Sequence, residues 1–149
     1  MTTKALMYLA MLSMAFTTAT ANDGPRPVKE INAKPNSLIT AFMKAHQNGD
    51  AALFDAVLKD GAVIKINRKD KISSHSKSDV VQFYRKSGEI ILNCSCNFEI
   101  LSSNDCTMLA RVDFKFPEFV QQNFVYMEKD RKGAWKITEI NRFNVSQGI

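Results

Sequence analysis

The sequence is poor in the residues from which metal centres and disulfide frameworks are built. Its 149 residues include three cysteines and two histidines, His46 and His75. A zinc site needs three or four converging nitrogen, sulfur or oxygen ligands, so we expect no metal and no cofactor. Cys94 and Cys96 fall on the same face of a predicted strand, where their parallel side chains would strain a disulfide. We expect these two and Cys106 to be reduced, buried core residues.

No apolar run is long enough to cross a membrane. Residues 5–16 are apolar and uncharged, but a spanning helix needs about 20 such residues. Lys4 precedes the run and the small residues 19–21 follow it, which is the layout of a signal peptide. The alternative is an N-terminal helix that belongs to the folded body. We predict a signal peptide over residues 1–21, export to the periplasm or the medium, and no membrane contact after cleavage.

Basic charge is not concentrated along the chain. The net charge is +5, and Lys and Arg are scattered except between residues 65 and 77. A nucleic-acid binder usually gathers such charge on one face, so we predict no nucleic-acid partner. The cluster at 65–77 is either a solvated loop or a region that steers an anionic ligand.

The first part of the mature chain predicts a linker and three helices. Residues 22–35 contain three prolines and predict a flexible linker. Apolar residues then recur at helical spacing. We expect one helix to begin at Asn36 or Ser37 and end at Gly49, and a second to run from Asp50 to Gly61. A capping box of Ser76 and Asp79 opens a third helix, which closes before residue 88.

The second part alternates with a period of two, which is typical of strands. Strands are predicted over residues 90–100, 107–116, 119–128 and 134–145, with a short one at 62–67 and a loop at 68–75. The alternation places Cys94, Cys96, Phe98 and Ile100 on one apolar face. Three helices followed by long antiparallel strands predict an α+β fold with the helices on one face of a sheet.

Four segments resemble a known superfamily. AFMKAHQNGD (residues 41–50), KDGAVIKI (59–66), VVQFY (80–84) and GAWKI (133–137) resemble, in order and spacing, the nuclear-transport-factor-2-like superfamily. Its exported bacterial members, including SnoaL-like domains, are the most similar. The resemblance implies a cone-shaped fold over residues 36–149, with a strongly curved antiparallel sheet wrapped around three N-terminal helices and a pocket at the wide end.

The same resemblance argues against the superfamily's known chemistry. Enzymes similar to ketosteroid isomerase place proton-transferring groups where this chain has Phe42, Ile66 and the neighbourhood of Phe124, none of which can transfer a proton. Relatives of limonene epoxide hydrolase use an Asp-Arg-Asp set. Here Arg111 and Asp113 match only part of it, and the alternation places both on the outer face.

Six residues are candidates for lining the pocket. The alternation of the last strand places Glu139 and Asn141 inward as polar anchors, unless a strand bulge leaves Glu139 in solvent. The remaining candidates supply walls: Phe42, Tyr84, Cys96 and Phe114.

The sequence thus favours an exported domain that binds a small apolar molecule, or that dimerises, without a complete catalytic set. Leu109, Val125 and Met127 are expected on the outer sheet face as the homodimer surface. The alternative function is a hydratase, isomerase or cyclase in which Glu139 is the general base and Tyr84 the hydrogen-bond donor.

Overall fold

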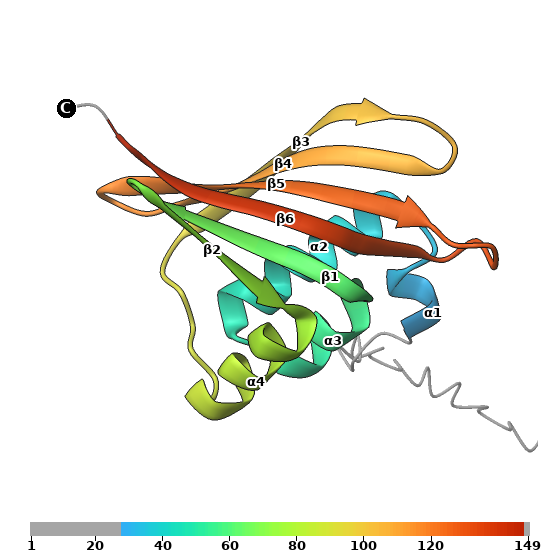
Figure 1. Cartoon of the computed structure of the whole chain (residues 1–149), viewed down its shortest axis with the longest axis horizontal. Helices are drawn as coiled ribbons and strands as arrows, with labels where there is room; N and C mark the ends of the chain where they lie inside the picture. The colour runs from blue at the N-terminus through green and yellow to red at the C-terminus, as the bar shows by residue number, and fades with distance from the viewer. Residues whose placement is uncertain (1–27, 148–149) are drawn as a thin grey trace, which may run out of the picture.

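Helices cover the concave face of a curved sheet (Figure 1). The computed structural model describes residues 28–147; the predicted signal peptide lies outside them. The helices are α1 (Val28–Ile31), α2 (Pro35–Asn48), α3 (Ala51–Val57) and α4 (Lys77–Ser87). The strands are β1 (Leu58–Arg68), β2 (Lys71–Ser76), β3 (Ser95–Ser103), β4 (Thr107–Lys115), β5 (Phe119–Lys129) and β6 (Trp135–Ser146). The predicted α+β class is confirmed.

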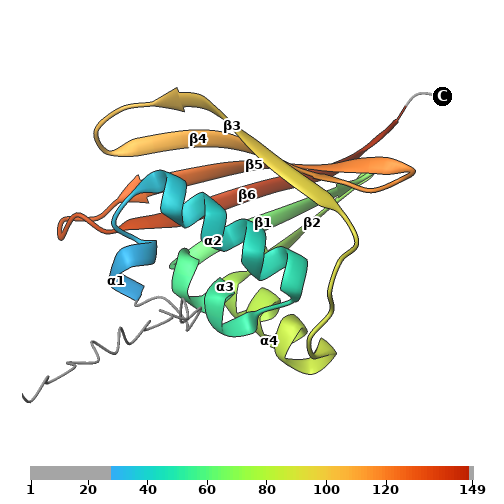
Figure 2. The ribbon, with the colours of Figure 1, turned by 180° about the vertical axis from the view of Figure 1, so that it is seen from behind.

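The strands form one mixed sheet in the order β2-β1-β6-β5-β4-β3. Neighbours are antiparallel except β1 and β6, which run parallel, so the expectation of a purely antiparallel sheet holds for every pair but this one. Figure 2 shows α2 lying across the concave face, with α3 and α4 gathered toward the β1 and β2 end. This arrangement leaves α4 as one wall of the space under β1 and β6.

Residues at the helix ends correctly predicted where α2 ends and where α3 and α4 begin. Gly49 ends α2 with a left-handed φ of 62°, and the Asp50 carboxylate accepts a 3.0 Å hydrogen bond from the Leu53 amide to start α3. The capping box of Ser76 and Asp79 opens α4 as predicted. The expected cap of α2 was wrong, because the helix begins at Pro35, a residue suited to a first turn, without a side-chain cap.

Several predicted boundaries were wrong because tertiary pairing outweighed local sequence. Residues 28–31 of the predicted linker form α1, and Ile31 packs into the core. The predicted loop at 68–75 contains β2, which pairs with β1. Gly61 lies within β1 rather than at a helix end. The strand expected from residue 90 begins at Ser95, and Ile91 is 81% exposed.

The core confirms the inward alternation of β4. Ala110, Val112 and Phe114 are completely buried. Phe114 meets Phe42 edge-on, with ring centroids 6.1 Å apart, and Phe42 meets Phe54 in the same way at 6.2 Å. This aromatic cluster joins α2 and α3 to β4, the strand next to the β3 edge of the sheet.

A bulge reverses the alternation of β6. Tyr126 of β5 pairs with Glu139 while Met127 pairs with Ile137, so Thr138 has no partner in the register. One extra residue moves every later side chain to the other face. Ile137 and Ile140 are therefore both buried, and the predicted inward orientation of Glu139 and Asn141 was wrong.

The structure places these polar residues on the outer face of the sheet. Glu139 accepts hydrogen bonds from Lys65 at 3.0 Å and Asn141 at 2.9 Å. The prediction that Val125 and Met127 lie on the outer face as part of the dimer surface was also wrong, because both are buried core residues. Leu109 is half-buried and pairs with the exposed Tyr126.

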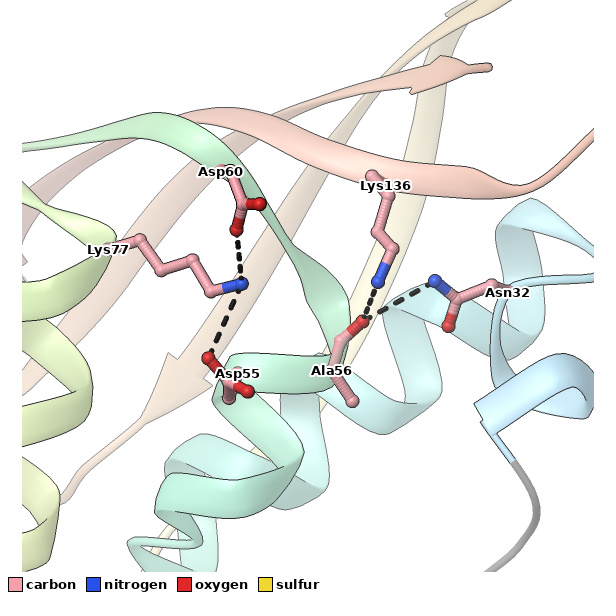
Figure 3. A network of polar contacts seen from close by, with 6 residues as sticks. All are labelled: Asn32, Asp55, Ala56, Asp60, Lys77 and Lys136. Carbon is pink, nitrogen blue, oxygen red and sulfur yellow. Dashed lines mark hydrogen bonds and ion pairs between the residues drawn. The ribbon is translucent and has the colours of Figure 1, made fainter. Parts of the chain in front are cut away.

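A network of polar contacts joins α3 to α4, β1, β6 and the segment after α1 (Figure 3). The Lys77 ammonium lies 3.0 Å from Asp60 and 3.3 Å from Asp55, which joins α4 to β1 and α3. The Lys136 ammonium and the Asn32 amide both donate to the carbonyl of Ala56. The last carbonyls of a helix lack helical partners, so β6 and the segment after α1 together cap the end of α3.

Replacing Lys136 with Met should lower the free energy of unfolding by about 1 kcal/mol, because the Ala56 carbonyl then loses its stronger donor. Lys132→Met, in the exposed turn before β6, is the matched control and should change stability by less than about 0.5 kcal/mol. Urea unfolding followed by circular dichroism measures both. Equal losses in the two variants would contradict this role for Lys136.

Candidate functional site

A cavity of about 310 Å³ lies between α4 and the strands β1 and β6. Its inner wall is apolar and buried, and four residues form it: Phe54, Leu58, Ile64 and Ile140. Arg68, Asp79 and Phe83 are exposed and mark the rim, where His75 is half-buried. Such a space is typical of small-molecule sites, which are mostly apolar with a few placed polar groups.

Arg142 is the cation that the bulge turns toward this cavity. It lies two residues after Ile140 on the inward face of β6. Its Nε donates a 2.7 Å hydrogen bond to Oδ1 of Asn123, which is completely buried. Burial lowers the pKa of Arg142, although an arginine keeps its charge at neutral pH. Among residues 28–147, no carboxylate forms an ion pair with it.

His46 is buried beside the cavity and joins three elements. Its Nδ1 lies 2.9 Å from the Tyr84 hydroxyl on α4, and its Nε2 lies 2.8 Å from Oε1 of Gln121 on β5. Burial and the charge of Arg142 lower the pKa of His46 to about 3. The imidazole is therefore neutral at physiological pH, and it carries a single ring proton.

The partners of His46 determine which group donates in each of its hydrogen bonds. Because the Gln121 Oε1 can only accept, the His46 proton resides on Nε2 and Nδ1 accepts. The Tyr84 hydroxyl then donates to Nδ1. Burial raises the pKa of the Tyr84 hydroxyl, and the charge of Arg142 lowers it by a smaller amount. Donors thus run from Tyr84 through His46 to Gln121.

This arrangement favours binding over proton transfer. The single proton of Tyr84 is committed to His46, and burial raises the pKa of Tyr84, so it stays neutral. The Nδ1 lone pair of His46 is occupied by that proton. Neither group is free to act as a base toward a bound molecule. What remains directed at the cavity is the guanidinium of Arg142, a donor with a fixed positive charge.

The structure separates the predicted pocket residues from one another. Tyr84 lines the cavity. Phe42 and Phe114 are completely buried and pack against the His46 ring, with centroids 6.4 and 4.4 Å away. Cys96 is half-buried opposite Phe114.

Glu139 and Asn141 bond each other on the outer face of the sheet, away from the cavity. Glu139 and Tyr84, the residues of the alternative enzyme, therefore lie on opposite sides of the sheet.

Sequence reasoning missed Arg142 and considered His46 only as a potential metal ligand. The signal for Arg142 was hidden, because its inward orientation depends on the Thr138 bulge. His46 was visible as the polar member of an apolar helix stripe. A polar side chain on such a stripe needs buried partners, and here these come from residues 38 and 75 positions away.

Other candidate residues lie outside the cavity. Arg111 and Asp113 interact at 3.3 Å on the same strand, and neither lines the cavity. The three cysteines are free. Burial raises the pKa values of Cys94 and Cys96, whereas Cys106 is exposed, contrary to expectation. Within residues 28–147, no cluster of three ligating side chains forms a metal site, and no helix has the length and hydropathy of a membrane span.

Comparison with solved structures identifies the fold. An NTF2-like protein of unknown function from Silicibacter pomeroyi superimposes with a TM-score of 0.60 at 11% identity, covering 75% of this chain and 92% of its own. A ketosteroid isomerase-like protein from Erwinia carotovora atroseptica gives a TM-score of 0.62 at 13% identity, over 79% and 98%.

A cystatin-like fold protein from Burkholderia xenovorans gives a TM-score of 0.63 at 9% identity, over 80% and 95%. No family model and no curated protein sequence matches the chain. The chain therefore has the nuclear-transport-factor-2-like fold, as its four sequence segments predicted. At such identities the likeness concerns the fold, so function has to be argued from the cavity.

The low pKa of His46 predicts a pH-dependent stability. The unfolded chain binds a proton at this residue below about pH 6.5, whereas the folded protein does so only near pH 3. The free energy of unfolding is therefore highest above pH 6.5, where His46 is neutral in both states. It decreases as the pH falls, because protonation of His46 then favours the unfolded chain. The slope should approach about 1.4 kcal/mol per pH unit between these values. Urea unfolding at pH 7, 6 and 5 measures it.

His46→Gln should remove this slope, because it removes the titrating group. Phe114→Leu, which weakens the same region without removing an ionisable group, should retain it. Parallel profiles for the wild type and His46→Gln would show that the imidazole does not titrate as described.

Proposed function

We propose that this protein binds a small, largely apolar molecule in the cavity beside Tyr84 and Arg142, without catalysing a reaction on it. The observation that carries the proposal is the cavity itself: an apolar, partly enclosed space of about 310 Å³ whose polar groups are few and held by other residues. Sites for small ligands combine an apolar wall with a few such anchors.

The hydrogen-bond chain supports binding because it makes the cavity rigid. Tyr84 is held by His46 and Arg142 by Asn123, so neither side chain has to be ordered when a ligand enters. A wall that is organised in advance reduces the entropy lost on binding. The Tyr84 hydroxyl donates its proton to His46 and so does not donate it to a bound molecule, which supports a non-catalytic role.

We propose further that the protein is exported, on the basis of the signal-peptide layout of residues 1–21, and that it forms homodimers through the outer sheet face. A specific feature favours the dimer. Phe124 and Phe143 stack on that face with centroids 5.5 Å apart, and Tyr126 and Val145 are each 40% exposed. Apolar groups gathered on an open face are typical of protein interfaces.

Native mass spectrometry of the protein purified from its own host tests these proposals together. A co-purifying small molecule supports binding, and a doubled mass supports the dimer. A mature chain beginning near residue 22 supports cleavage of the signal peptide. An intact N-terminus on the exported protein would contradict cleavage.

Filling the cavity should abolish binding of a neutral apolar dye. Val80 lines the cavity from α4, so Val80→Trp should eliminate the fluorescence gain of N-phenyl-1-naphthylamine seen with the wild type. Lys86→Trp, on an exposed position of the same helix, is the matched control and should bind the dye normally. Equal dye binding by the wild type and both variants would contradict this site.

A further inference from the structure

The cavity contains a positive charge that the protein does not neutralise. In residues 28–147 the guanidinium of Arg142 has one hydrogen-bond partner, the amide oxygen of Asn123, which is uncharged. Burying a charge without an opposite charge is costly. The Asn123 contact offsets that cost only in part, because it supplies a dipole rather than a counter-charge.

The other charges near the cavity do not neutralise Arg142. Asp79 lines the rim but forms no ion pair with Arg142, and its carboxylate accepts a 2.8 Å hydrogen bond from the Ser76 amide in the capping box of α4. Glu139, three residues before Arg142, is bound to Lys65 on the opposite face of the sheet. Arg68 adds a second positive charge at the exposed rim. The cavity is thus an apolar space with an excess of positive charge.

We propose that the ligand of this cavity is an apolar molecule with a single carboxylate, and that Arg142 binds the carboxylate. This inference rests on the proposed binding function and specifies the chemical class of the ligand. The apolar part would lie against Phe54, Ile64 and Ile140, and the acid group would face the guanidinium. Arginine pairs with carboxylates through strong, directional, charge-assisted hydrogen bonds.

The number of charges favours a carboxylate over a phosphate. A phosphate monoester carries nearly two negative charges at neutral pH, whereas the interior of the cavity offers one guanidinium. Tyr84 does not assist an anion as a donor, since its proton is committed to His46. One cation with one anion leaves the enclosed space neutral, which is the least costly arrangement in an apolar environment.

Four probes with the same eight-carbon chain separate the contribution of the charge from that of the apolar part. Isothermal titration calorimetry at pH 7 should show octanoate binding about 10- to 100-fold more tightly than 1-octanol, as expected for one charge-assisted hydrogen-bonded pair. Octylammonium should bind more weakly than the alcohol. Monooctyl phosphate should bind more weakly than octanoate, and the reverse order would overturn the assignment of a carboxylate.

Arg142→Met should remove the preference for octanoate while retaining the binding of 1-octanol, which also shows that the variant folds and keeps its cavity. Arg68→Met, at the exposed rim, is the control and should keep most of the preference. If Arg68→Met removes the preference and Arg142→Met does not, the inference is overturned. If Arg142→Met does not fold, the comparison of octanoate with 1-octanol on the wild type decides.

The same measurements distinguish a wrong ligand class from a wrong binding site. If the wild type binds 1-octanol as tightly as octanoate, the carboxylate is excluded and the apolar site stands. If it binds none of the probes, and Val80→Trp leaves the dye signal unchanged, both the site and the inference are overturned.

Discussion

The chain of hydrogen bonds through His46 is the constraint on which the arrangement of helices and sheet depends. Each atom in it has one suitable role: Gln121 accepts, so His46 donates to it, and Tyr84 donates to His46. The chain begins on α4 at Tyr84 and passes through α2 to β5. Because His46 is buried and its partners are half-buried, losing one member leaves its neighbours without partners, which costs more than the bond itself contributes.

The same chain explains why the cavity exists. A helix packed only by apolar contacts can settle toward the sheet until the space closes. Tyr84 holds α4 at the distance set by the lengths of two polar side chains, and the stack of Tyr84 on Phe54, at 4.5 Å between centroids, fixes the tilt of its ring. The aromatic cluster of Phe42, Phe54 and Phe114 fills the neighbouring volume, so the space remains on the side of β1 and β6.

The fold could be predicted from the sequence where the signals are local, and the site could not where they depend on pairing. Gly49, Asp50 and the Ser76 capping box specify helix ends through their own backbone and side chains. The period of two in β4 specifies its inward face. The orientation of Glu139 and Arg142 depends on the unpaired Thr138, which no periodicity reveals. Likewise β2 is polar except for the exposed Ile72, and it is a strand because β1 lies beside it.

The parallel pairing of β1 with β6 has a consequence for how the chain folds during synthesis. Lys65 and Glu139, which are bonded across these strands, are 74 positions apart. The ends of so long a loop must come together before the pair forms, which slows the folding of such topologies. Two residues that line the cavity, Ile140 and Arg142, lie on β6, the last strand to be synthesised. A ribosome that has not released residues 135–146 therefore holds a chain whose cavity is still incomplete.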